Sequence, residues 1–212
     1  MAAYMDLIFL GIVVALILFR LNNVLGTRPD HPQIKIVTKK EFDKIYDMIQ
    51  NKIQDDERFG AIKVSDTKAD DDLSQIENFD KNIFLKRASK AFEMILNAFA
   101  NRDTETLKML TTSKLYEKFS QIIDERKAQN ITAESELIKI DEMKIDDVKI
   151  TQKTAKIAIK FVSSQINVLK NADGEVIEGD ENFVQQITDV WTFEKDLNSA
   201  SHVWLLCSTK KK

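Results

Sequence analysis

The 212-residue chain contains a single cysteine, Cys207, so it cannot form a disulfide bond within itself. This excludes a small scaffold stabilised by disulfides, and it favours a protein that folds in a reducing compartment. Glycine is also scarce, and the five glycines are scattered along the chain at Gly11, Gly26, Gly60, Gly174 and Gly179. This spacing excludes a glycine-rich phosphate loop.

The chain has no excess of one charge and very little histidine. It carries 31 Lys and Arg against 34 Asp and Glu, for a formal charge of −3. Such a balance predicts neither general affinity for nucleic acid nor an acidic tail. The two histidines, His31 and His202, lie far apart, and neither has the spacing of a metal ligand. We therefore expect no metal and no other cofactor.

Long hydrophobic runs are absent except at the N-terminus. Residues 2–21 reach the roughly 20 residues that a spanning helix needs, provided that Asp6 and Arg20 lie at the two interfaces. We interpret residues 1–21 as a transmembrane anchor, because the run leaves no polar face; a buried helix of a soluble protein is the alternative. The apolar residues of this anchor are Leu7, Ile8, Phe9, Leu10, Ile12, Val13, Val14, Leu16, Ile17, Leu18 and Phe19.

Basic residues follow the anchor and set its predicted orientation. The residues close to its C-terminal end are Arg20, Arg28, Lys35, Lys39 and Lys40. The positive-inside rule therefore predicts an outward N-terminus and places the bulk of the chain on the cytoplasmic side. A cleaved secretory signal is not favoured, because no positive segment precedes the run and no small-residue cleavage site follows it.

We interpret residues 22–82 as a polar and acidic linker. They contain both prolines of the chain, Pro29 and Pro32, and the acidic patch at residues 70–72, with too few apolar residues to stay folded alone. Within the linker, residues 39–54 carry apolar side chains at helical spacing and predict an amphipathic helix. Docking on a partner or on lipid headgroups, packing on the C-terminal domain and short self-association all stay open for this helix.

From residue 83 to the end, at residue 212, the pattern predicts one folded domain. Apolar residues at spacings of three and four predict helices over residues 83–99, 104–110 and 113–130. Alternation then predicts four strands, at residues 137–150, 155–161, 187–193 and 203–207. This order predicts an α+β fold, with helices packed on a curved four-stranded antiparallel sheet. A sheet that curls round a helix often encloses an apolar pocket.

Several residues of this domain match the motifs of a known family in their order along the chain. In the long helix they are Phe84-Leu85, Ala88, Ala91-Phe92-Glu93-Met94-Ile95, Ala98-Phe99-Ala100 and Asp103. Later they are Leu107, Leu110, Tyr116, Phe119, Asp173-Gly174, Glu178-Gly179, the run from Asp189 to Glu194, Trp204 and Leu205. This pattern over residues 83–209 resembles the Tim44-like domain family of the mitochondrial inner-membrane import subunit and its bacterial relatives. Leu25-Gly26 after a membrane helix is also similar to a bacterial member.

The chain departs from the family pattern at four positions. Arg87 and Arg102 stand where the family usually has small residues or glycine. Lys195 stands where arginine is usual, and His202 stands where proline is common. These departures concern partner contacts more than the fold.

The resemblance implies a cone-shaped fold similar to that of nuclear transport factor two, a large apolar pocket, affinity for anionic membrane lipid and a role in protein transport. We therefore expect a single-pass protein of a bacterial inner membrane that is not an enzyme. Its expected partners are anionic lipid and a polypeptide client or translocase components, and no nucleic acid. A ribosome-associated adaptor is an alternative, because a mitochondrial ribosomal protein has a similar domain.

Two sets of residues are candidates for contacts. The pocket set consists of Phe92, Ile95, Phe99, Asp189, Trp191, Phe193 and Trp204, for which ordinary core positions are the alternative. The headgroup set consists of Lys86, Arg87 and Lys90 on one turn of the first helix, for which a solvated face is the alternative.

Asp189 is the one candidate for chemistry, because it shares a strand face with Trp191 and Phe193. A carboxylate in an apolar cone can act as a general base with a raised pKa, and cone-fold isomerases use this arrangement. A structural hydrogen bond is the simpler role. Cys207 has an ordinary interpretation as a small core residue. We predict a non-enzymatic protein, with a small-molecule enzyme that uses Asp189 as the alternative.

Overall fold

The computed structural model describes residues 62–64, 73–199 and 203–211. The predicted anchor at residues 1–21, the predicted helix at residues 39–54, His31 and His202 lie outside the described residues. Among the residues that are described, no helix combines the length and the apolar character needed to cross a bilayer.

The three predicted helices are confirmed. They are α4 (Lys81–Ala100), α5 (Thr104–Leu110) and α6 (Ser113–Ala128). Aspartates cap the first two helices, because an aspartate before a helix can accept from a backbone N–H that has no helical partner. Asp80 accepts from the Ile83 N–H at 2.8 Å, and Asp103 accepts from the Thr106 N–H at 3.0 Å.

Two arginines tie the C-terminal ends of α4 and α6 together. Arg102, which follows the C-cap residue of α4, donates from Nη2 to the Ile131 carbonyl oxygen at 2.7 Å. Arg126, in the last turn of α6, donates from Nη2 to the Phe99 carbonyl oxygen at 2.8 Å, and its guanidinium lies 4.3 Å from the centroid of the Phe99 ring. The last carbonyls of a helix have no partner within it, so Arg126 supplies α4 with a missing donor.

Over the described residues the sheet has six strands and is mixed, so the expectation of four antiparallel strands is incomplete. Four long strands lie in the order β2-β3-β5-β6 and pair antiparallel as predicted. They are β2 (Thr132–Ile150), β3 (Thr154–Lys170), β5 (Gln185–Asp196) and β6 (Leu205–Lys211). In addition, β1 (Lys63–Val64) pairs parallel with β2, and β4 (Val176–Gly179) pairs antiparallel with β3. Both extra strands are too short to show a two-residue period in the sequence.

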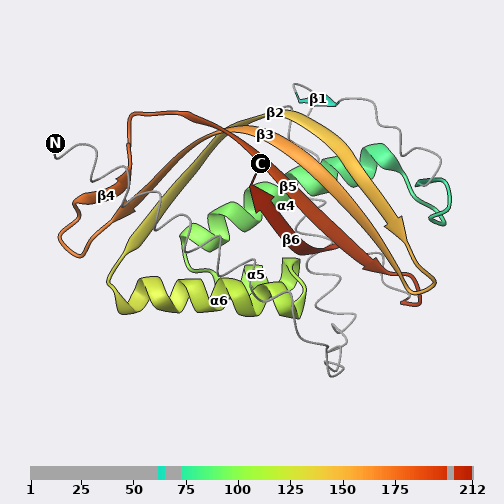
Figure 1. Cartoon of the computed structure of the whole chain (residues 1–212), viewed down its shortest axis with the longest axis horizontal. Helices are drawn as coiled ribbons and strands as arrows, with labels where there is room; N and C mark the ends of the chain where they lie inside the picture. The colour runs from blue at the N-terminus through green and yellow to red at the C-terminus, as the bar shows by residue number, and fades with distance from the viewer. Residues whose placement is uncertain (1–61, 65–72, 200–202, 212) are drawn as a thin grey trace. The chain divides into compact units, whose positions relative to one another are not determined.

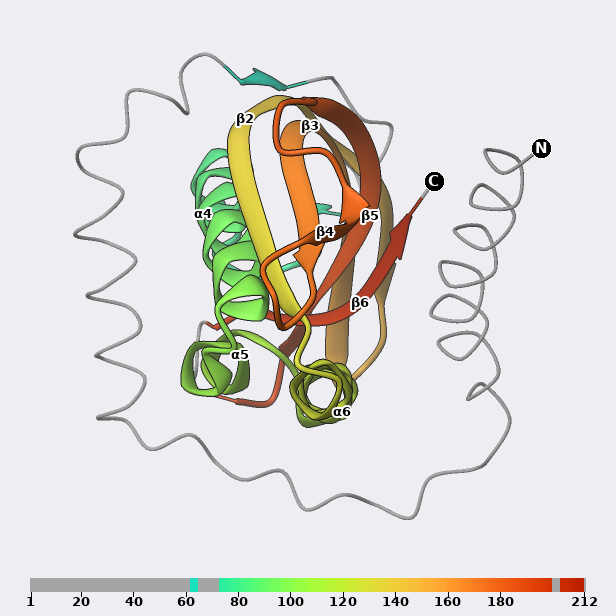
Figure 2. The same ribbon diagram turned by 90° about the vertical axis from the view of Figure 1, so that its left-hand side faces the viewer.

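The helices lie on the concave side of the arched strands (Figures 1 and 2). Phe92 of α4 is fully buried there, with its ring centroid 4.4 Å from that of Phe161 and 4.5 Å from that of Trp191. Burying such a side chain contributes about 1.5–3 kcal/mol to folding, before the added cost of a cavity is counted. The sheet therefore curls because its apolar face must follow the apolar face of α4.

The core also includes residues that we assigned to the linker. Leu73 and Ile76 are 5% and 4% exposed and belong to the same core as α4. Phe79 lies against Phe84 and Trp204, with ring centroids 5.3 Å and 6.0 Å away. The structure therefore packs residues that precede the expected start at residue 83, and Ile62 also lies against this core.

The last strand is out of phase with the predicted alternation of Val203, Leu205 and Cys207. Leu206 is the fully buried residue of β6 and lies opposite Phe193, whereas Cys207 is half-buried. An irregularity between Thr192 and Phe193 shifts the register at this point. Because strand side chains alternate between faces, a slip of one residue exchanges the inward and outward sets.

β4 and β5 occupy the same side of β3, one after the other. Val168 of β3 lies opposite Gly179, and Gln165 lies opposite Gln185, so residues 180–184 form a loop that leaves the line of the strand. Gly179, at the start of this loop, has φ of +87° and faces the Asn167 carbonyl oxygen, which a Cβ atom would approach to 2.1 Å. Only glycine fits both requirements.

We expect Gly179→Ala to lower the free energy of unfolding by about 2–4 kcal/mol, since it adds a clash with rigid backbone to a left-handed conformation. Gly174→Ala is the matched control, because Gly174 has φ of +82° but nothing lies within 4 Å of the added Cβ. It should cost about 1 kcal/mol. Urea unfolding measures both variants, and equal losses would contradict the close approach at Gly179.

Candidate functional site

The structure brings most of the predicted pocket residues together, but it packs them against one another in the core. Phe92, Ile95, Trp191 and Phe193 are 0%, 1%, 4% and 2% exposed. Phe99 is half-buried and lies against Phe119 with the two rings tilted and their centroids 4.9 Å apart. These side chains fill the interior of the arch, and ligand contact by them remains a prediction.

Trp204 lies at the outer end of this aromatic core. Its ring centroid is 5.0 Å from that of Phe84, in the edge-to-face arrangement that aromatic pairs prefer. Phe84 in turn lies edge-to-face with Phe193 at 6.1 Å. Trp204 therefore links β6 to the start of α4, and a core role accounts for its position.

Asp189 lies on the same face as Trp191, opposite Phe161 of β3 and Lys211 of β6. Burial raises the pKa of Asp189 to about 6, and the positive charge of Lys211 opposes this rise. In the part of the chain that the structure describes, its carboxylate has no hydrogen-bond partner, so the simpler structural role that we considered is not seen there. A pKa close to the operating pH suits a general base.

A chain of neutral polar side chains on β3 was not anticipated from the sequence. Gln165 donates to the Ser163 hydroxyl at 2.7 Å, Asn167 donates to Gln165 at 3.1 Å, and Ser135 of β2 donates to Asn167 at 2.6 Å. Ser163 and Gln165 are 0% and 2% exposed. The signal in the sequence is the polar run at residues 163–165, which interrupts the apolar alternation of β3. Bonding along the strand satisfies these buried groups.

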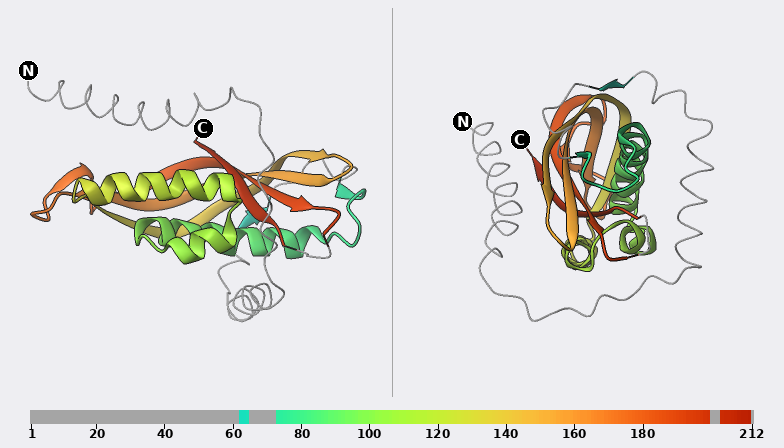
Figure 3. Two further views of the ribbon diagram at one scale, coloured as in Figure 1. Left: turned by 90° about the horizontal axis from the view of Figure 1, so that it is seen from below. Right: turned by 90° about the vertical axis from the view of Figure 1, so that its right-hand side faces the viewer.

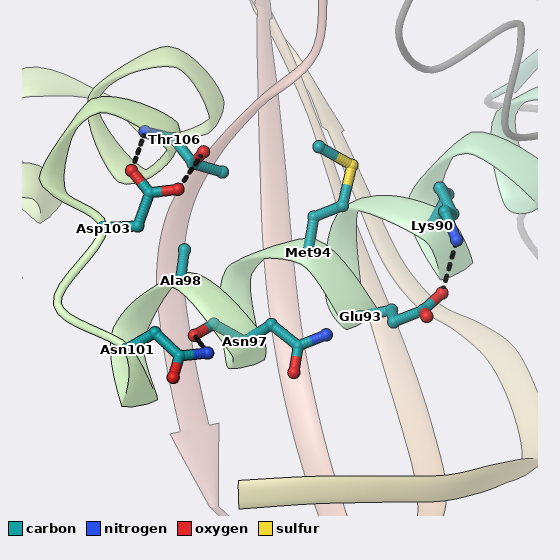
Figure 4. A pocket seen from close by; sticks show the side chains of 8 residues that line it. All are labelled: Lys90, Glu93, Met94, Asn97, Ala98, Asn101, Asp103 and Thr106. Carbon is teal, nitrogen blue, oxygen red and sulfur yellow. Dashed lines mark hydrogen bonds and ion pairs between the residues drawn. The ribbon is translucent and has the colours of Figure 1, made fainter. Parts of the chain in front are cut away.

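A shallow hollow of about 210 Å³ lies between α4 and the start of α5 (Figure 4). Its lining is made of Lys90, Glu93, Met94, Asn97, Ala98, Asn101, Asp103 and Thr106. Several polar groups of the lining form hydrogen bonds or ion pairs with each other. Lys90 pairs with Glu93 at 2.7 Å, and Asp103 accepts from the Thr106 hydroxyl at 2.6 Å. The bonds from Thr106 lower the pKa of Asp103, so this hollow holds a fixed carboxylate with a capping role.

The predicted headgroup set is divided by the structure. Lys86 and Arg87 are half-buried, whereas Lys90 is only 9% exposed and faces Glu93. A cation that already has a close carboxylate partner gains little from a second anion. Because Lys86 and Arg87 are more exposed than Lys90, they are better placed to reach a charged surface.

Within the described ranges, neither Cys207 nor a cluster of metal-ligating residue types supplies a further centre. Burial raises the pKa of the Cys207 thiol to about 11, so the reactive thiolate is a minor form at neutral pH. Among residues 62–64, 73–199 and 203–211, no group of three His, Cys, Asp or Glu side chains is placed to hold a metal ion. Asp189 is therefore the carboxylate considered for chemistry, because burial raises its pKa to about 6.

These features define an α+β domain in which a long helix fills the concave side of an arched, mainly antiparallel sheet. The sequence profile of the Tim44-like domain matches residues 73–211, and the chain belongs to the Tim44-like domain family. The match includes Leu73 and Ile76, which belong to the same buried core as α4.

The relatives of the chain are import subunits of the mitochondrial inner membrane. It is 29% identical over 147 residues to a probable mitochondrial import inner membrane translocase subunit tin-44 of Caenorhabditis elegans, covering 66% of this chain and 35% of the relative. It is 27% identical to the human subunit TIM44, covering 56% of this chain and 26% of that protein. The chain therefore spans about a quarter to a third of these relatives. Among solved structures, the intermembrane space region of chloroplast protein ARC6 has a TM-score of 0.45 at 14% identity, covering 63% of this chain and 97% of that one.

We expect Asp189→Asn to stabilise the protein at neutral pH. The pKa of the folded state, about 6, exceeds the ordinary 3.8, so the carboxyl favours folding while it is protonated. That contribution is complete below about pH 4 and is lost as the pH rises through about 6. The variant should therefore gain about 1–2 kcal/mol above pH 6, after allowance for partial exposure, and little below pH 4.

Urea unfolding across this pH range measures the effect. Asp124→Asn, at an exposed position of α6, is the control and should change stability by less than about 0.5 kcal/mol. A stability gain for Asp189→Asn that does not depend on pH would contradict burial of the charged carboxylate.

Proposed function

We propose that the protein is a membrane-anchored binding protein that takes part in protein transport at an inner membrane. The observation that carries this proposal is the family match over residues 73–211, because the relatives that share this region are named as inner-membrane translocase subunits. Since the chain spans only part of those relatives, the shared domain is the basis for the proposal, not their whole activity.

Residues 1–21 supply the proposed anchor, with the N-terminus outside and the C-terminal domain on the cytoplasmic side of a bacterial inner membrane. A domain held at the bilayer meets its membrane partners at a high local concentration, which allows weak contacts to matter. Binding by the domain therefore needs neither a deep pocket nor chemistry.

The proposed contacts are with anionic lipid and with a polypeptide client or translocase component. Lys86 and Arg87 of α4 are the proposed headgroup contacts, since both are partly exposed and carry positive charge. Each basic residue near an anionic surface contributes about 1 kcal/mol to attraction. Two such residues give weak binding, which suits a domain that the anchor already holds in place.

A small-molecule enzyme that uses Asp189 is the second candidate, favoured by the raised pKa of this carboxyl in apolar surroundings. This role requires Asp189 as a base, so Asp189→Asn should abolish activity while leaving the fold intact. Full function of that variant in cells would remove the candidate.

The role in transport predicts a defect when the protein is depleted. Newly made proteins should reach the inner membrane, or cross it, more slowly, and the full chain should restore their arrival. Residues 22–212 should restore it poorly, because the domain is no longer concentrated at the bilayer. Pulse labelling followed by membrane fractionation measures arrival. Unchanged arrival after depletion would contradict a role in transport, and full restoration by residues 22–212 would contradict the anchor.

The lipid contact predicts charge-dependent binding of residues 22–212 to vesicles. Vesicles with anionic lipid should retain more protein in flotation than neutral vesicles, and the double variant Lys86→Gln with Arg87→Gln should lower this retention by about threefold or more. Lys114→Gln with Lys118→Gln, on α6, is the control with the same charge change. Equal retention on neutral and anionic vesicles would count against lipid binding.

A further inference from the structure

Exposed apolar side chains gather at one end of the sheet. Of the seven large apolar residues that are exposed in the described part of the chain, four lie within residues 176–184. They are Val176, Ile177, Phe183 and Val184, with exposures of 42%, 50%, 59% and 47%. We call residues 171–184, which contain β4 and the loop to β5, the tip. It projects past the end of α6 (Figure 3), and a clustered apolar surface with a polar rim is typical of a contact site.

The tip is also strongly acidic. Its five acidic residues are Asp173, Glu175, Glu178, Asp180 and Glu181. The sequence has no Lys or Arg between Lys170 and Lys195. Lys170, at its base, already pairs with Glu134 at 2.8 Å and with Glu181 at 2.6 Å, and both partners raise its pKa. The tip therefore combines exposed apolar side chains with an excess of negative charge, which attracts cations and repels anionic lipid.

One edge of β4 is open to pairing. Among the described strands, β4 pairs only with β3, and β6 pairs with β5 only from Asp189 onward. The backbone of β4 therefore has an edge without a neighbouring strand in this part of the chain. An edge of this kind can accept an added strand, with backbone hydrogen bonds supplying affinity and side chains supplying selectivity.

We propose that the tip binds an extended, cationic polypeptide segment in which apolar and basic side chains alternate, and that this segment adds as a strand to the open edge of β4. The apolar side chains of such a segment match the exposed Ile177 and Phe183, and its basic side chains match the acidic residues of the tip. A second copy of the tip fits poorly, because pairing would bring like charges together. This inference rests on the proposed role in polypeptide binding and names the surface and the chemistry of the bound segment.

The test measures binding of labelled synthetic peptides to the full-length chain by fluorescence anisotropy. One peptide alternates lysine and valine, a second has the same composition at helical spacing, and a third replaces lysine with glutamate. The alternating lysine peptide should bind most tightly, and its affinity should fall as salt is added, because added ions screen exposed charges. Tighter binding of the helical-spacing peptide, or of the glutamate peptide, would overturn the proposal.

Two variants test the surface itself. Ile177→Thr with Phe183→Ser should weaken binding of the alternating lysine peptide by about tenfold. Ile83→Ser, at an apolar residue of α4 that is 49% exposed, is the control and should leave binding unchanged. Ile177, Phe183 and Ile83 are all about half exposed, and substitutions at such positions rarely disturb folding.

The charge variant replaces three exposed acids of the tip, as Asp173→Asn, Glu175→Gln and Asp180→Asn, and it spares Glu181 because Glu181 holds Lys170. It should weaken binding by about threefold or more and flatten its salt dependence. Glu77→Gln, Glu117→Gln and Asp124→Asn together make the same charge change elsewhere and should have no such effect.

The outcomes separate the surface from the wider function. If the lysine peptide binds and the tip variants bind it as well as the wild type, the proposed site at the tip is wrong, whereas polypeptide binding by the chain is supported. If no peptide binds the full-length chain, the tip proposal is overturned, and the transport role is then judged by the depletion experiment.

Discussion

The structure depends on one packing constraint: the apolar face of α4 must be covered by the sheet. Phe92 lies against Phe161 and Trp191 at the centre of this contact, and the strands arch to reach it. Yet the partners differ in length. A 20-residue helix extends about 30 Å, whereas the 17 residues of β3 extend about 55 Å. Because the sheet is longer than α4, one end of it has no cover from this helix. β4 and the loop that follows it are formed at that end.

The elements with strong periodicity could be predicted from the sequence, and those without it could not. The three helices repeat their apolar residues over several turns, so their positions were clear. β1 has only two residues, and β4 follows a turn directly, so neither shows a period. In β6 the inward residue opposite Phe193 is Leu206, whereas the sequence predicted Leu205, and the register shifts at this point. A local irregularity of this kind depends on the neighbouring strand and leaves no trace in the strand's own residues.

The site was harder to predict than the fold, because a pocket and a core require the same residue types. Phe92, Ile95 and Trp191 point inward in either case, and only the distances between them show that the space is filled. Asp189 was found because a carboxylate in an apolar alternation is conspicuous, and burial does shift its pKa. The buried chain of Ser163 and Gln165 was missed, since polar residues in a strand are usually assigned to the solvent face.

The two arginines at the helix ends have a consequence for how the domain deforms. Arg102 reaches from the end of α4 to Ile131, where β2 is about to begin, and Arg126 reaches back from α6 to Phe99. Both bonds join the C-terminal end of α4 to the C-terminal end of α6, so these two ends cannot separate while the bonds hold. Breaking both at once exposes two carbonyls and two guanidinium groups, at a cost of a few kcal/mol. At this end of the domain α4 and α6 should therefore move together, next to the point where β2 begins.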